Sequence, residues 1–201
     1  VPDSGCGSWL WEPQSTNLIT YSEDFSDAAS WSKGGTSVVS GFTSPSGDTS
    51  AFKISGTGGN SYHNIRTSIS TTNSTVSCFV KKGTLNHFEF IDTIGGVPYS
   101  VVQYNLEEVT ANVNVAGVFL NPKIEDYGNG WYRCSTEATA TAQIHLNISK
   151  GSTDGTGLIE ANDYLYIWGA QLEQQSYATS YIPTSGSTVT RNQDVCTNGG
   201  S

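Results

Sequence analysis

Polar side chains that can form hydrogen bonds recur on one side of several strand-like segments. His145 and Asn147 alternate with three aliphatic residues, and His87 and Glu89 alternate with two phenylalanines. Such alternation is typical of strands with one face in a core and one in solvent, and a curved solvent face can hold a polar ligand. An alternative for Arg133 and Glu89 is a cross-strand ion pair. The candidate ligand-binding side chains of these faces are His87, Glu89, Gln103, Arg133, His145 and Asn147.

The chemistry that these groups suit is saccharide binding. Sugar hydroxyls need polar partners, because a hydroxyl buried without one costs about 1–3 kcal/mol, and aromatic rings pack against the apolar faces of sugars. Tyr62 and Tyr99 each lie next to turn residues and are the candidate rings. Large aromatic residues such as Trp31 and Trp168 are more often part of a core.

Catalysis has little support in the sequence. There is no HExxH, GxSxG or P-loop motif, and the three histidines lack metal-ligand spacing. The acidic pairs Glu107-Glu108 and Glu125-Asp126 are adjacent in sequence, so in a strand their carboxylates would point to opposite faces. Glycoside hydrolysis needs two carboxyl groups about 5–10 Å apart in one cleft. We therefore predict that the chain is not an enzyme.

The composition is that of one large all-β domain. The 201 residues include 22 glycines, 11% aromatic residues and only 13% charged residues, a mixture too aromatic for disorder. The net charge of −9 argues against nucleic acid partners, which require a basic footprint. No apolar run approaches the roughly 20 residues of a membrane span, so membrane insertion is not expected. Because the chain has no methionine, we interpret it as a processed form or an excised domain.

The segment 163–183 is the one around which the expected fold is organised. Residues 164–173 alternate and are apolar on both faces, which predicts a central strand, with Gly169 marking a bulge or a close backbone approach. The strand-like run 16–21 is expected to lie beside it. Further strands separated by Gly, Asn and Asp turns predict a sandwich or barrel. They are expected at 36–40, 50–55, 62–68, 75–81, 87–92, 99–106, 112–120, 131–139 and 143–149.

The domain boundaries follow from these strands. Residues 1–15 form an N-terminal edge segment in which Trp9 to Trp11 pack as a short edge strand, residues 16–191 form a single sandwich, and residues 192–201 form a tail.

Four cysteines are an even number, but the sequence alone does not give their connectivity. Cys6 and Cys196 lie near the two ends and would pair if the termini lie on adjacent strands. Cys78 and Cys134 lie within strand-like runs, and a disulfide between them requires neighbouring strands with Cα atoms within about 7 Å. The alternative is that this inner pair stays reduced as small core residues.

Three segments carry a resemblance to known proteins. NLITYSEDFSDAASW (17–31) resembles the opening strand and loop of the jelly-roll carbohydrate-binding modules attached to many glycanases. GNGWYRCS (128–135) and YIWGAQLEQQSYATSYIPTSGSTVTR (166–191) resemble a module of bacteriophage tail, fibre and head-decoration proteins and of related bacterial surface proteins. The resemblance covers the chain from about Trp9 to Cys196. It implies an all-β jelly-roll β-sandwich of two antiparallel sheets, of the concanavalin or galactose-binding type, that binds a glycan on a virion or in an extracellular setting.

The resemblance also implies features outside the glycan site. No cofactor is required, although related modules often hold a structural calcium near the first and last strands. Asp24 matches the acidic residue before Phe25, with Glu23 beside it, whereas Ser26 stands where those modules often place Glu. The alternative is that both acids are ordinary loop carboxylates, because calcium requires six to eight oxygens.

A second hypothesis for the function is a structural subunit of a virion or filament that forms homo-oligomers, trimeric or filamentous, through protein contacts.

Overall fold

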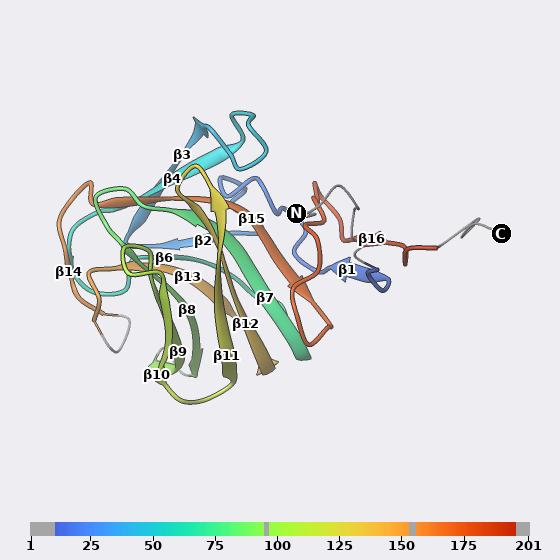
Figure 1. Cartoon of the computed structure of the whole chain (residues 1–201). Helices are drawn as coiled ribbons and strands as arrows, with labels where there is room; N and C mark the ends of the chain where they lie inside the picture. The colour runs from blue at the N-terminus through green and yellow to red at the C-terminus, as the bar shows by residue number, and fades with distance from the viewer. Residues whose placement is uncertain (1–10, 95–96, 153–155, 196–201) are drawn as a thin grey trace.

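Alternating apolar residues build two antiparallel sheets, each of six strands (Figure 1). The structure is a computed structural model, and it describes residues 11–94, 97–152 and 156–195. Sheet I contains, in spatial order, β10 (Thr110–Val115), β9 (Val97–Asn105), β8 (His87–Ile94), β13 (Ile144–Ser149), β6 (Asn64–Thr67) and β2 (Ser32–Gly34). Sheet II contains β11 (Phe119–Gly128), β12 (Trp131–Thr141), β7 (Thr71–Lys81), β15 (Tyr164–Glu173), β4 (Ala51–Gly56) and β3 (Thr36–Phe42).

Two short strand pairs complete the arrangement. β1 (Ser15–Asn17) pairs with β16 (Val189–Arg191), beside the two large sheets (Figure 1). β5 (Gly59–Asn60) pairs with β14 (Leu158–Ile159). The described residues contain no helix, so none of them forms an apolar helix long enough to span a membrane. The all-β, sandwich-like architecture that the sequence predicts is therefore confirmed.

The inner faces of the two sheets enclose one hydrophobic core. Phe88, Phe90 and Tyr104 of sheet I are fully buried there with aliphatic residues of sheet II, and their rings pack against one another. The Tyr104 hydroxyl donates a 2.6 Å hydrogen bond to the Ser135 carbonyl of β12, which joins the two sheets. This bond satisfies the one polar atom that the buried ring brings into the core.

The strand β15 lies in the middle of sheet II, between β7 and β4, with the bounds that the sequence predicts. Its register with β7 shifts between Trp168 and Gln171, and Gly169 adopts a left-handed φ of 60° at this bulge. A side chain there would lie 3.0 Å from Phe79 and 3.1 Å from Tyr181, so the close backbone approach predicted at this glycine is confirmed.

The N-terminal segment lies beside β15 at the bulge, as expected. The Leu18 N–H donates to the Leu172 carbonyl at 2.8 Å, and the Ala170 N–H donates to the Ser22 carbonyl at 2.9 Å. The fully buried Asn17 amide donates to the carbonyls of Ala170 and Ile182 and accepts from the N–H groups of Ile19 and Leu172. Asn17 thus pairs backbone groups that the irregular ladder leaves free.

Three local predictions need correction. The run 112–120 is not one strand, because the chain turns after Val115 and enters the other sheet at Phe119. Of the run 16–21, only residues 16 and 17 belong to a strand, β1. Trp11 is 53% exposed and outside any strand, whereas Trp9 and Leu10 of the expected edge strand lie outside the described residues.

The inner cysteines are neighbours but are not bonded. Cys78 of β7 and Cys134 of β12 are directly opposite in the antiparallel register, and both face the core as free, fully buried thiols. Burial raises the pKa of Cys78 to about 12. The structure therefore has two reduced core residues rather than the inner disulfide. Cys6 and Cys196 lie outside the described residues, so their pairing stays a prediction.

Candidate ligand-binding site

The outer face of sheet I brings together five of the predicted site residues. Antiparallel register places Gln103, Glu89 and Asn147 in one row across β9, β8 and β13, and this row continues into β6. His145 lies two residues before Asn147 and therefore on the same face, and so does His87 relative to Glu89. Tyr99 belongs to β9, but its side chain lies outside the described part of the structure.

One half of this face is closed around a buried carboxylate. Glu89 is fully buried and accepts hydrogen bonds of 2.7 Å from the Gln103 amide, the Asn147 amide and the Ser149 hydroxyl. The Gln103 amide also donates to the Ser152 carbonyl at 2.7 Å, so the chain after β13 passes over the carboxylate. These groups are occupied with one another, and they support the sheet beside the open half.

The open half is a pocket of about 370 Å³. It contains two of the predicted residues, Tyr62 with a half-buried side chain and His145, and several that the sequence analysis did not single out. Its lining residues are Gly34, Gly35, Ser61, Tyr62, Asn64, Arg66, Thr93, Gln143 and His145.

Asn64 and Arg66 flank the buried Ile65 on β6 and point to the face opposite the core. Register places them directly opposite Asn147 and His145 of β13. The alternation of polar residues with Ile65 was the available signal for both residues.

Two buried polar atoms in the pocket wall have no partner in the described part of the chain. Asn64 is 2% exposed and its Oδ1 accepts no hydrogen bond, and His145 is 4% exposed and its Nδ1 is unpaired. The other ring nitrogen of His145 shares a 3.3 Å contact with Gln143 Oε1. Most buried polar side-chain atoms in native proteins have partners, so two unpaired atoms in one pocket indicate a place for a ligand or water.

The His145 imidazole is neutral at pH 7. Burial, together with the Arg66 guanidinium on the neighbouring strand, lowers its pKa from 6.5 to about 4. A neutral imidazole can donate or accept a hydrogen bond, depending on its tautomer. The ring can therefore pair with a ligand hydroxyl that donates a hydrogen bond or with one that accepts it.

Two glycines shape the pocket wall opposite β6. Gly35 has a left-handed φ of 62°, and a side chain there would lie 2.9 Å from the Tyr62 carbonyl. A Cβ on Gly34 would lie 3.2 Å from Asn64 Oδ1 and 3.7 Å from Arg66 Nη1. The space above Gly34 is therefore a point on which the Asn64 and Arg66 side chains converge.

Arg133 is not part of this surface. It belongs to β12 of sheet II, where it is 3% exposed, donates to the Ser77 hydroxyl at 3.1 Å and lies over the Phe79 ring. The alternative ion pair with Glu89 does not form, because the two residues lie in different sheets. Trp31 and Trp168 are 1% and 6% exposed, as expected for buried rings; Trp31 belongs to the core between the sheets and Trp168 to a second buried cluster with Phe79 and Trp131.

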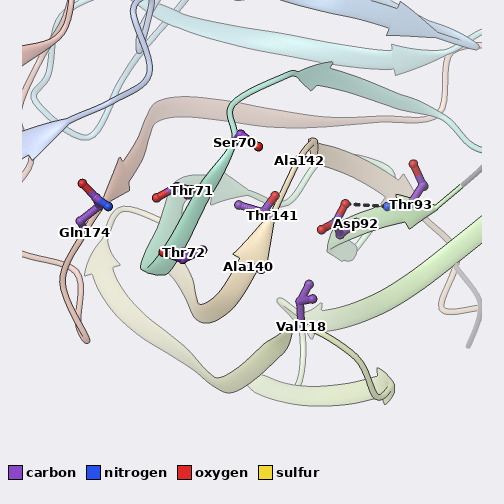
Figure 2. Close-up of a pocket in the computed structure, with 10 residues that line it drawn as sticks. All are labelled: Ser70, Thr71, Thr72, Asp92, Thr93, Val118, Ala140, Thr141, Ala142 and Gln174. Atoms are coloured by element: carbon purple, nitrogen blue, oxygen red, sulfur yellow. Dashed lines mark hydrogen bonds between the residues drawn. The ribbon is translucent and has the colours of Figure 1, made fainter.

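A larger pocket of about 710 Å³ lies at one end of the two sheets, where β7, β8 and β12 meet (Figure 2). Its one ionisable lining group is Asp92, whose pKa burial raises. The Asp92 carboxylate accepts a 2.8 Å hydrogen bond from the Thr93 N–H, and polar groups of Gln143, Thr141 and Ala142 also act to lower its pKa. None of the described residues that line the pocket is aromatic. This pocket therefore suits a ligand less well than the pocket on sheet I.

The predicted calcium residues have local partners. Glu23 accepts a 3.1 Å hydrogen bond from the Tyr181 hydroxyl, and its pKa is raised, chiefly by burial. Asp24 accepts hydrogen bonds from the N–H and hydroxyl of Ser26 within its own turn. The described residues contain no group of three or more His, Cys, Asp or Glu arranged for a metal. Calcium binding here stays a prediction.

Comparison with protein-family models finds none that matches the chain, and comparison with curated proteins finds no significantly similar sequence.

Proposed function

We propose that the chain is a non-catalytic carbohydrate-binding module with a jelly-roll topology, carried on the surface of a phage fibre or decoration protein or of a bacterial surface protein. The observation that carries this proposal is the pocket on sheet I. It combines a half-buried tyrosine ring with the unpaired polar atoms of Asn64 and His145. A ring for an apolar sugar face, and unpaired groups for hydroxyls, are what saccharide recognition requires.

Weak binding at such a site is compatible with this role. The pocket offers one aromatic ring and is open to solvent, so a single module would hold a sugar loosely. Repetition of the module on a multimeric fibre would raise avidity by a factor of about 10² to 10⁴ without any new contact.

A structural subunit of a virion or filament is the second candidate. It is favoured by apolar side chains on two neighbouring edge strands, Val113 of β10 and Leu120 of β11, each 41% exposed. Unpaired edge strands with exposed apolar groups can pair with another copy of the chain. In that case the polar pocket would have no ligand.

A glycan-array screen of the purified chain tests the first proposal. The chain is displayed multivalently and screened with calcium and with a chelator. We expect selective binding that Tyr62→Ala weakens about tenfold or more, as expected for loss of a stacked ring. Tyr177→Ala is the matched control, because Tyr177 is 43% exposed and lies outside the pocket.

The outcomes separate the two candidates. Loss of binding in the chelator would support the Asp24 calcium site. A silent array, with assembly into trimers or filaments by light scattering, would contradict the glycan proposal and favour the structural subunit.

A further inference from the structure

We propose that the saccharide recognised by the pocket on sheet I carries a carboxylate, which the Arg66 guanidinium binds at the pocket wall. This inference rests on the proposed function and specifies the class of sugar.

Arg66 has no anionic partner in the part of the chain that the structure describes. None of the hydrogen bonds or salt bridges found among the described residues involves its guanidinium. The side chain is half-buried at the pocket wall rather than extended into solvent. A guanidinium held in a cleft without a carboxylate is prepared to bind one, because its planar fork matches carboxylate geometry with two parallel hydrogen bonds.

The local charge of the pocket contrasts with that of the chain. Acidic residues outnumber basic residues by 18 to 9, yet no Asp or Glu is among the described residues that line the pocket. Glu89 lies on the same face but is fully buried and already accepts three hydrogen bonds from Gln103, Asn147 and Ser149. His145 is neutral at pH 7, so Arg66 is the charged group among the described lining residues.

The strand register places other polar groups of the pocket beside Arg66. Gly34, Asn64 and Asn147 form one row across β2, β6 and β13, and Arg66 and His145 lie in the next row. Because position 34 has no side chain, Asn64 Oδ1 and Arg66 Nη1 lie close over its backbone, 3.2 and 3.7 Å from where a Cβ would stand. A carboxylate in the pocket would bond Arg66. Adjacent sugar hydroxyls would then lie beside Asn64 and His145, whose Oδ1 and Nδ1 have no partner among the described residues.

Calorimetric titration of the full chain with three sets of probes tests the proposal. The first set contains oligosaccharides of hexuronic acids and of sialic acid, the second their methyl esters or carboxyl-reduced counterparts, and the third sulfated oligosaccharides of similar size. We expect the carboxylated set to bind about 10- to 100-fold more tightly than its neutral counterparts, the range for a charged, bidentate hydrogen bond.

Three variants locate the effect. Arg66→Gln is expected to remove the preference for carboxylate while leaving the weaker binding of neutral sugars. Gly34→Ala, whose methyl group would press on Asn64 Oδ1 and Arg66 Nη1 and shift both side chains, is expected to weaken the carboxylated set most. Lys33→Gln is the matched control, because it removes one positive charge from the same strand at an exposed residue outside the pocket. Unchanged melting temperatures show that the variants are folded.

The outcomes distinguish this inference from the proposed function. Equal binding of carboxylated and neutral probes, sensitive to Tyr62→Ala, would overturn the inference and leave the function in place. Preference for sulfated probes, or equal losses in Arg66→Gln and Lys33→Gln, would overturn the carboxylate assignment. Binding of no probe at all would overturn both.

Discussion

The buried imidazole of His145 makes the stability of the protein depend on pH. The His145 ring lies between β6 and β8, opposite Arg66 on one side and Ile91 on the other. Burial and the neighbouring guanidinium lower its pKa from 6.5 to about 4, so the folded state resists protonation. The unfolded chain binds this proton more readily, and acid therefore favours unfolding.

The size and sign of the effect follow from proton linkage. Below pH 6.5 the unfolded state gains the proton first, so the contribution of His145 is fully present above this pH and is lost as the pH falls towards 4. With about 1.4 kcal/mol per pKa unit, the loss is about 2 kcal/mol at pH 5 and about 3 kcal/mol at pH 4.

The assay compares urea unfolding of the wild type and of His145→Asn between pH 7.5 and pH 4. Other groups titrate in both proteins, so the difference between their free energies of unfolding isolates His145. This difference should shrink by about 3 kcal/mol as the pH falls, because asparagine cannot be protonated in this range. Proton NMR of the wild type should show one imidazole that stays neutral to about pH 5.

The reasoning would be refuted by a difference that stays constant with pH, or by an NMR pKa for His145 of 6 or higher. Either result would mean that the ring is hydrated or paired in solution. The unpaired Nδ1 that marks the candidate site would then be absent.

Three further predictions concern the fold. Asn17→Ala removes four hydrogen bonds to buried backbone groups and should lower the free energy of unfolding, measured in urea titrations, by about 3–5 kcal/mol. A loss below about 1 kcal/mol would contradict the role assigned to this side chain. Cys78 and Cys134 should react with a thiol reagent only on unfolding, because both are buried with raised pKa values, and rapid labelling of the native protein would contradict this. Val109→Asn should raise the melting temperature by a few degrees, because the exposed Val109 has a left-handed φ of 53° that asparagine tolerates better.

The central strand could be predicted from the sequence because several local signals agree there. Period-two alternation, apolar residues on both faces and a proline ten residues beyond its end all indicate a buried strand at β15. Sequence alone did not reveal β11, most of whose residues are exposed or half-buried and include Pro122 and Glu125. An edge strand needs no apolar face, so its residues look like those of a loop.

Alternation assigns a residue to a face but not to a sheet. Glu89 and Arg133 both lie on the outer side of their strands, as their polar neighbours predict, yet they belong to sheets on opposite sides of the core. Only long-range strand pairing decides which outer faces coincide. This is why the sequence could group His145 with Asn147, on one strand, but not Arg66 with His145, on two strands.

The two outer faces of the protein differ in what covers them, and this difference determines where a ligand can bind. On sheet II the chain after β15 folds back over the sheet, and Tyr181 packs on Trp168 and Phe79 with ring centroids 4.5 and 5.9 Å apart. The aromatic rings on this face are thus covered by the chain itself. On sheet I the covering chain reaches Glu89 and Gln103 but leaves the β6 side open. A ligand therefore meets few rings and many polar groups, which favours a charged or highly hydroxylated sugar over an apolar partner.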